Sequence, residues 1–234
     1  MNHLVVAHDE WLAARTAFLA EEKEFTRQRD ELTRKRSELP WEAVEKEYTF
    51  DGPNGKETLA SIFDGRSQLI VYHFMFPPEW EAGCPHCSFW ADNFNEVIIH
   101  MNYHDITMVA ISRAPSAKLQ AYRERMGWSF KWLSSGASDF NYDYFASFTE
   151  EQRASKKAYF NYAIQNPGMS DREGASVFYK DEAGRIFHTY STFARGIDMM
   201  NTAYHWIDTT PKGRDEGKGN QYWIRRHDEY DRKP

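Results

Sequence analysis

The segment around the two cysteines constrains the fold more than any other part of the chain. Residues 68–76 form a nearly continuous apolar run rich in β-forming residues, which is typical of a strand buried on both faces. A loop then leads to Cys84, and Pro85 at a first helical position favours a helix through about residue 101. Residues 105–112 form a second buried strand. We therefore expect a βαβ unit with parallel strands and with the cysteines where the first strand gives way to the helix.

The rest of the chain adds strands and appendages to this unit. A chain of 234 residues exceeds one average domain of roughly 150 residues, so we expect one enlarged domain. The expected elements are a hairpin over residues 48–59, a helix over 117–126, a strand over 128–133, a hairpin over 175–191 and a last helix over 196–206. The predicted boundaries are an amphipathic helical arm over 1–45, a core domain over 46–208 with an insertion at about 134–174 that contains a helix, and a polar loop and tail over 209–234.

The arm carries a regular apolar row. Trp11, Phe18, Phe25 and Leu32 recur every seven residues, which predicts one long helix over residues 9–37. The other positions of this helix are densely charged. The row is typical either of a dimerisation or partner helix or of an arm folded back on its own domain. We favour the second interpretation, because the companion seam is too polar for a sustained coiled coil.

Composition and charge exclude several classes of protein. Apolar residues make up 41% of the chain and aromatic residues 16%, which is enough for a packed core and excludes wholesale disorder. The net charge of -6 lacks the basic footprint of a nucleic-acid-binding protein. The sequence contains neither an apolar run long enough for a membrane span nor a basic, hydrophobic export signal at its start. We expect a cytoplasmic protein that binds neither nucleic acid nor membrane.

The tetrapeptide Cys84-Pro85-His86-Cys87 is the most informative motif. Two cysteines at this spacing can alternate between dithiol and disulfide without a large motion. The helix N-terminus stabilises a thiolate on Cys84, and a protonated His86 beside it lowers the pKa further. Cys84 is therefore the expected attacking sulfur and Cys87 the resolving one, with a bias towards an oxidising pair. We expect both sulfurs to lie side by side within reach of solvent.

Two other interpretations of the cysteines remain open. A zinc site needs two more ligands, for which His73, His100, His104 and His188 are candidates, but no second Cys/His pair stands at a zinc-binding spacing. Buried structural cysteines are the other possibility. Dithiol chemistry is favoured over both, since a Pro-His pair between the cysteines and a βαβ context are more than chance supplies.

The order of these elements is similar to that of the thioredoxin fold. The Cys-Pro-His-Cys motif matches that of periplasmic disulfide oxidases in this superfamily. More closely, the chain resembles a bacterial thioredoxin-like family catalogued as domain of unknown function 899 and described as predicted dithiol-disulfide oxidoreductases. The stretches that carry this resemblance are residues 21–24, 39–41, 83–95, 127–128, 187–196 and 213–216.

This resemblance implies a thioredoxin-like three-layer α/β/α sandwich with a mixed central sheet. It also implies a thiol-disulfide oxidoreductase. For such an enzyme we expect no bound cofactor or metal and an exchange of electrons with a thiol or disulfide substrate and a cellular reductant, and we include a homodimer among the expected partners. A thiol peroxidase of the peroxiredoxin type is an alternative, although neither Pro77 nor Pro78 meets the peroxiredoxin motif spacing. A non-catalytic thioredoxin-fold binding or scaffold protein is the other.

One departure from thioredoxins affects the expected substrate. Thioredoxins place a cis-proline just before the first strand of the hairpin, whereas this chain has Gly174-Ala175-Ser176. The difference favours a small thiol, a peroxide or an altered substrate over an extended polypeptide.

Several further residues are expected to shape the site. The topology brings Arg113, Ala175 and Arg195 to the sheet edge at which the cysteines lie. Trp80 and Trp90 flank the cysteines and are expected to shield them. The aromatic residues of the insertion either roof the pocket as a lid or pack in the core: Phe140, Tyr142, Tyr144 and Phe145.

Overall fold

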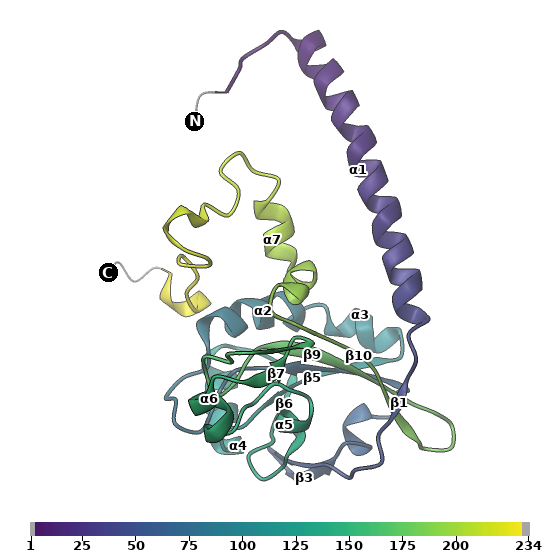
Figure 1. Ribbon diagram of the computed structural model, residues 1–234, viewed down its shortest axis with the longest axis vertical. Helices are drawn as coiled ribbons and strands as arrows, with labels where there is room; N and C mark the ends of the chain where they lie inside the picture. The colour runs from purple at the N-terminus through teal and green to yellow at the C-terminus, as the bar shows by residue number, and fades with distance from the viewer. Residues whose placement is uncertain (1–2, 231–234) are drawn as a thin grey trace. The chain divides into compact units, whose positions relative to one another are not determined.

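The computed structural model describes residues 3–230 (Figure 1). The chain divides into two compact units between Pro40 and Trp41. The predicted arm and tail extend at their ends into residues 1–2 and 231–234, which lie outside the described residues. No helix within the described range is long and apolar enough to cross a membrane.

The first unit contains the long helix α1, His8–Ser37. Pro40 follows its end, as predicted. None of its described side chains is buried, and the row that begins with Trp11 and ends with Leu32 is exposed. Ion pairs such as Glu24–Arg27 line its surface. The two interpretations of the arm, a partner helix and a self-packing arm, stay predictions.

The second unit is built around one mixed sheet of eight strands. Its strand order is β1-β10-β9-β4-β5-β6-β2-β3. The central strand β4 is parallel to β5, which is parallel to β6, and β4 is antiparallel to β9. The bounds are β1 Glu42–Ala43, β2 Thr49–Gly52, β3 Gly55–Thr58, β4 Gln68–His73, β5 Ile106–Ser112, β6 Lys131–Ser134, β9 Gly174–Lys180 and β10 Ile186–Phe193.

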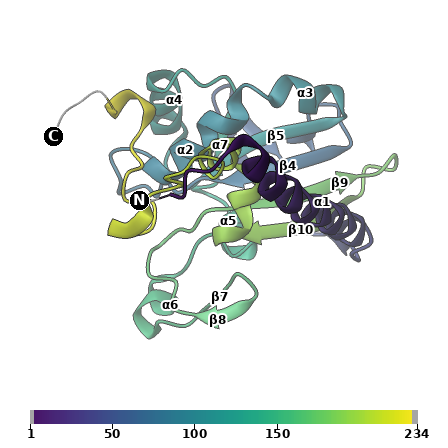
Figure 2. The same cartoon turned by 90° about the horizontal axis from the view of Figure 1, so that it is seen from above.

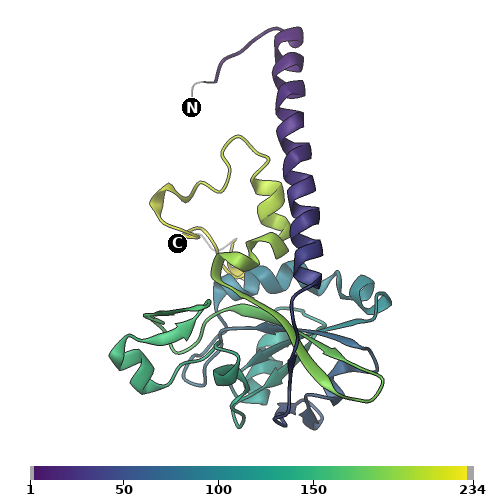
Figure 3. The ribbon, with the colours of Figure 1, turned by 45° about the vertical axis from the view of Figure 1, so that its right-hand side comes forward.

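Helical elements connect and cover these strands. The small hairpin of the insertion, β7 with β8, stands together with α6 at one side of the unit (Figures 2 and 3). The bounds are η1 Ser61–Phe63, α2 Pro85–Asn95, α3 Ile98–Tyr103, α4 Ser116–Arg125, α5 Phe140–Asp143, α6 Glu150–Ser155, β7 Ala158–Phe160, β8 Ala163–Gln165, η2 Ala194–Met200, α7 Thr202–Ile207, η3 Glu216–Lys218 and η4 His227–Glu229.

The two faces of the sheet carry separate hydrophobic clusters. On one face, α2, α4 and α7 bury Trp90, Leu119 and Tyr204 together with the aromatic residues of the strands. On the other face, η1 and α5 bury Phe63 and Phe140 with a second set of strand residues. Helical elements therefore lie on both faces, and the parallel βαβ unit continues into an antiparallel hairpin. The predicted thioredoxin-like α/β sandwich is confirmed.

Two predicted helices are each interrupted. The helix that begins at Pro85 ends at Asn95, and α3 begins after a break. At this break the Asn95 carboxamide oxygen accepts the backbone N–H of Ser129. The predicted last helix is likewise split into η2 and α7 by Asn201, whose side chain caps the backbone N–H of Tyr204. In both places an asparagine side chain accepts a hydrogen bond from a backbone N–H at the point where the predicted helix is interrupted.

The glycine before the first cysteine packs tightly. A Cβ on Gly83 would lie 2.7 Å from the Phe74 ring and 2.9 Å from the Tyr122 ring. Phe74 cannot move away freely, because its ring centroid is 4.5 Å from that of Trp132. A methyl group at Gly83 therefore requires a shift of packed aromatic rings.

We predict that Gly83→Ala lowers the free energy of unfolding by about 1–3 kcal/mol, the usual cost of overpacking. Gly217→Ala is the matched control, since a Cβ there meets no atom within 4 Å. Denaturant titration of both variants tests this difference. Equal stabilities of the two variants would contradict the packing described here.

Candidate active site

The Cys-Pro-His-Cys motif lies at the carboxyl end of the central strand, as predicted. The chain leaves β4 after His73 and returns so that the backbone N–H of Cys84 donates to the carbonyl of Met75, at 3.1 Å. Cys84 is the N-cap residue of α2, and Pro85 is its first helical residue. Pro85 has no N–H to leave unpaired in this first turn, which explains why the helix begins here.

The two cysteines are free thiols in different environments. Cys84 Sγ lies 3.9 Å from Nδ1 of His86. A hydrogen bond from the Cys87 thiol, and after it a hydrogen bond with His86, holds the pKa of Cys84 well below that of an ordinary thiol. Burial acts in the opposite direction but does not cancel this effect on the pKa of Cys84. Burial above all, and then the neighbouring Cys84, raises the pKa of Cys87 well above its ordinary value. The site thus favours one thiolate, on Cys84, and one thiol, on Cys87.

His86 is electrostatically paired with this thiolate. Its hydrogen bond to Cys84 raises the pKa of the imidazole, while partial burial acts in the opposite direction. A protonated His86 therefore neutralises the charge on Cys84. The backbone N–H of Met75 donates to Cys87 Sγ at 3.4 Å, so the Cys87 sulfur is held against the segment that follows β4.

Both sulfurs are buried, which differs from the expectation that they are within reach of solvent. Cys84 is 5% exposed and Cys87 is 1% exposed. Part of the covering comes from residues 220–227, which we call the C-terminal cover. Within it, Arg226 donates to the carbonyl of Gly83 at 2.8 Å, and the Trp223 ring packs on Phe89 with centroids 5.5 Å apart.

A small cavity leads to the motif. Its volume is about 120 Å³, and it opens between α2, the segment before β9, η2 and the C-terminal cover. It reaches His86 and Cys87 directly, whereas Cys84 stands beside them at the N-cap of α2 and is not part of the lining. The lining residues are His86, Cys87, Trp90, Glu173, Ala194, Arg195, Ile197, Asp198, Asn220 and Gln221.

Most residues expected to shape the site lie near it. Trp90 lines the cavity, and its indole N–H donates to the carbonyl of Ile197 at 3.0 Å. Arg195 also lines the cavity, with a side chain that is 82% exposed and 3.3 Å from Asp198. Ala175 is buried in the same hydrophobic cluster as the cysteines, and Trp80 packs against that cluster.

Arg113 lies outside the residues that line the cavity. Its guanidinium forms two hydrogen bonds to the Asp171 carboxylate, at 2.7 and 3.0 Å, and also donates to the Tyr142 hydroxyl. The insertion therefore holds Arg113 by a buried ion pair. Of the insertion's aromatic residues, Phe140 and Tyr144 pack in the second hydrophobic cluster, away from the cavity lining.

The histidines considered as zinc ligands are not gathered around the cysteines. His73 and His188 are joined through two serines: Ser176 Oγ lies 2.8 Å from His73 Nε2, and Ser191 Oγ lies 2.7 Å from His188 Nε2. The two hydroxyls are 2.8 Å apart. His100 and His104 are exposed at α3. From residue 3 to residue 230, no group of three or more His, Cys, Asp or Glu side chains is placed to hold a metal ion.

Two parts of the site were missed in the sequence. Glu173 stands just before the position compared with the thioredoxin cis-proline, so its place at the site could have been inferred from that alignment. Gln221 and its neighbours carry no such signal, because they follow a polar, glycine-rich stretch that reads as a loop. Only the folded chain brings them to the cysteines.

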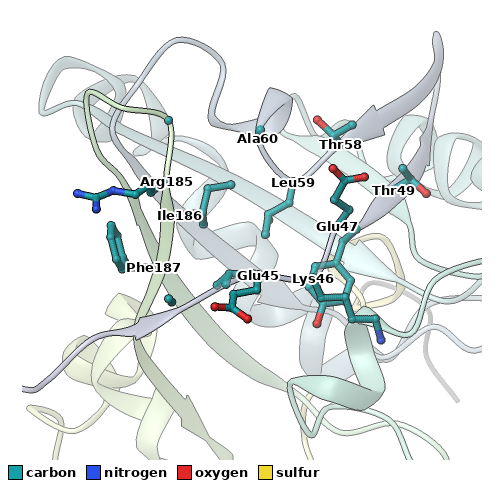
Figure 4. A pocket seen from close by; sticks show the side chains of 14 residues that line it. Glu45, Lys46, Glu47, Thr49, Thr58, Leu59, Ala60, Arg185, Ile186 and Phe187 are labelled. Carbon is teal, nitrogen blue, oxygen red and sulfur yellow. The ribbon is translucent and has the colours of Figure 1, made fainter.

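A larger pocket lies elsewhere. Its volume is about 570 Å³, and it is formed by residues 43–49, residues 58–60 and residues 184–187 at the start of β10 (Figure 4). Ile186 in this pocket pairs with Lys180, at the end of the hairpin opposite to Gly174 and Glu173. The pocket is thus separate from the cysteine cavity.

The chain is similar to several solved structures of other proteins. Among solved structures, it is similar to a bacterioferritin comigratory protein of Xanthomonas campestris, with a TM-score of 0.47, 10% identity and coverage of 69% of this chain and 94% of that one. It is also similar to the peroxidoxin BcpB of Mycobacterium tuberculosis, with a TM-score of 0.45, 12% identity and coverage of 72% and 97%.

At these scores the structural likeness carries no argument about activity. A search of curated proteins gives no match. The family model described as "Bacterial protein of unknown function (DUF899)" matches residues 1–230, and the chain therefore belongs to this family.

Proposed function

We propose that the protein is a dithiol-disulfide oxidoreductase in which Cys84 is the nucleophile and Cys87 the resolving thiol. One observation carries the proposal: two free thiols stand next to each other at the start of α2, with Cys84 Sγ 3.9 Å from Nδ1 of His86. The pKa displacements of Cys84 and Cys87, in opposite directions, agree with it. Nucleophilic attack on a disulfide requires a thiolate, and Cys84 is held as one. His86 supports this charge from the same helical turn.

The reaction balances over two steps. The Cys84 thiolate attacks one sulfur of a substrate disulfide, which forms a mixed disulfide and releases the first substrate thiol. Cys87 then attacks Cys84 Sγ, which releases the second substrate thiol and leaves the protein pair as a disulfide. Two electrons pass from the cysteines to the substrate. A cellular thiol or reductase restores the dithiol, and the same steps in reverse oxidise a substrate dithiol.

The size of the cavity supports a small substrate. About 120 Å³ admits the reacting end of a low-molecular-weight thiol or disulfide, whereas an extended polypeptide would have to displace the C-terminal cover. The same cavity would admit a peroxide. A thiol peroxidase therefore stays the second candidate, and peroxide consumption by the purified, reduced protein distinguishes the two.

We predict unequal effects of replacing the two cysteines. Cys84→Ser removes the nucleophile, so exchange with a small disulfide falls to the background rate. Cys87→Ser leaves the first step intact and blocks the second, so a stable mixed disulfide on Cys84 accumulates and is detected by mass spectrometry. Small and equal effects of both changes would contradict the assigned roles and favour a scaffold protein.

We further predict a pH dependence that follows from the lowered pKa of Cys84. The thiolate absorbance of the reduced protein should rise with pH at a midpoint below the ordinary cysteine value of about 8.5. Because His86 stabilises the charged form, His86→Ala moves this midpoint upwards. The single-cysteine variant Cys84→Ser is the control and should show only a high midpoint. A wild-type midpoint at or above that of a free thiol would refute the thiolate on Cys84.

A further inference from the structure

The second step of the proposed exchange requires a proton acceptor. Cys87 is buried and is held as a thiol, yet it must lose its proton to attack the mixed disulfide. Cys87 is 1% exposed and meets solvent through the small cavity that it lines. A side chain that lines the same cavity is therefore better positioned than bulk water to accept the proton.

Glu173 is placed to supply this acceptor. It directly precedes β9, whose first residue, Gly174, pairs with His73 at the end of β4. Glu173 is half-buried and lines the cavity together with His86 and Cys87. Its sequence neighbour Arg172 directs Nε to the carbonyl of Pro167, at 2.7 Å. Glu173 and Cys87 thus line the same small cavity, and Arg172 acts on the carboxyl group by its charge.

The other ionisable groups at the cavity are less suited to accept a proton. Asp198 is already paired with two cations, at 3.0 Å from Arg214 and 3.3 Å from Arg195. The hydrogen bond to Cys84 raises the pKa of His86 and favours the imidazolium, a form with no lone pair to offer. The Tyr72 hydroxyl, raised in pKa by burial and then by Cys87, stays protonated.

The electrostatics of Glu173 fit a role in both steps. Burial, and after it the Cys84 thiolate, raises the pKa of the carboxyl group. When Cys84 enters a mixed disulfide its charge disappears, so the repulsion that favours protonated Glu173 is relieved. The same carboxyl group is then more acidic during the first step and available as a base for the second.

We propose that Glu173 is the proton-transfer residue of the cysteine pair, an inference that rests on the proposed function. In the first step, Glu173 gives its proton to the departing substrate thiolate as Cys84 becomes neutral. In the second step, the Glu173 carboxylate takes the proton of Cys87 as Cys87 attacks Cys84, and then passes it to the second departing thiolate. The site begins with one negative charge on Cys84 and ends with one on Glu173. Two protons and two electrons reach the substrate.

Other groups face this carboxyl group and will contribute to any pH profile. They come from each element that borders the cavity, and a measured profile must be compared between variants and not interpreted alone. These groups are Cys84 at the N-cap of α2, His86 and Cys87 of α2, Tyr72 of β4, Arg172 beside Glu173, and Arg195 and Asp198 of η2.

The test is a single-turnover reaction of the reduced full-length protein with dipyridyl disulfide. The first thiopyridone is released when Cys84 attacks, and the second when Cys87 resolves the mixed disulfide. We expect Glu173→Gln to leave the first phase within a few-fold of wild type, because thiopyridone is a weakly basic leaving group that departs without a proton donor. The second phase should slow by about 100-fold, the typical contribution of a positioned base. In this variant the second phase should also become steeply dependent on pH, since hydroxide must replace the carboxylate.

Two further variants serve as controls. Glu81→Gln removes the same charge from an exposed position three residues before Cys84, outside the cavity lining, and should leave both phases unchanged. Glu173→Asp retains a carboxylate and should restore part of the second phase, which a purely structural role would not predict. If Glu173→Gln resolves the mixed disulfide at the wild-type rate and with the wild-type pH profile, the inference is overturned. If wild type releases no thiopyridone at all, the proposed function itself fails.

Discussion

The stability of a negative charge on the buried sulfur of Cys84 depends on the groups that surround it. Cys84 lies almost out of contact with water, where an isolated thiolate would be strongly disfavoured. The start of α2, the Cys87 thiol and the His86 ring compensate for this loss of hydration, and the compensation exceeds the cost of burial. Each of these groups is fixed by the same short turn, because Cys84 is the N-cap residue and Cys87 the third helical residue. The remaining features of the site are arranged around this charge.

The sequence was sufficient to predict the framework that presents the cysteines. The apolar runs of β4 and β5 and the proline at the start of α2 are local signals, and they predict the parallel βαβ unit that the structure contains. The turn signals of the β9–β10 hairpin are equally local. Breaks in helices were harder to predict, since the bond between Asn95 and Ser129 joins residues 34 positions apart.

The parts of the site that were not predicted depend on contacts distant in sequence. Arg226 reaches Gly83 across 143 positions, and no composition pattern indicates such a contact. Arg113 follows the last residue of β5 at the expected edge, but a carboxylate of the insertion, Asp171, binds it there. The C-terminal cover, which supplies part of the covering of the sulfurs, is held by the distant contact between Arg226 and Gly83. Local patterns thus predicted where the motif lies but not what encloses it.

Enclosure has a chemical consequence for the pair. A stabilised Cys84 thiolate stabilises the reduced form, which makes the disulfide easier to reduce and raises its reduction potential. The cover and the small cavity limit which thiols exchange with it. The most direct test of this account is the reduction potential of the Cys84–Cys87 pair, measured by equilibration with glutathione buffers. We predict a value clearly above the roughly -270 mV of thioredoxin. A value at or below it, or no reversible oxidation of the pair, would contradict the claim that the fold stabilises a thiolate on Cys84.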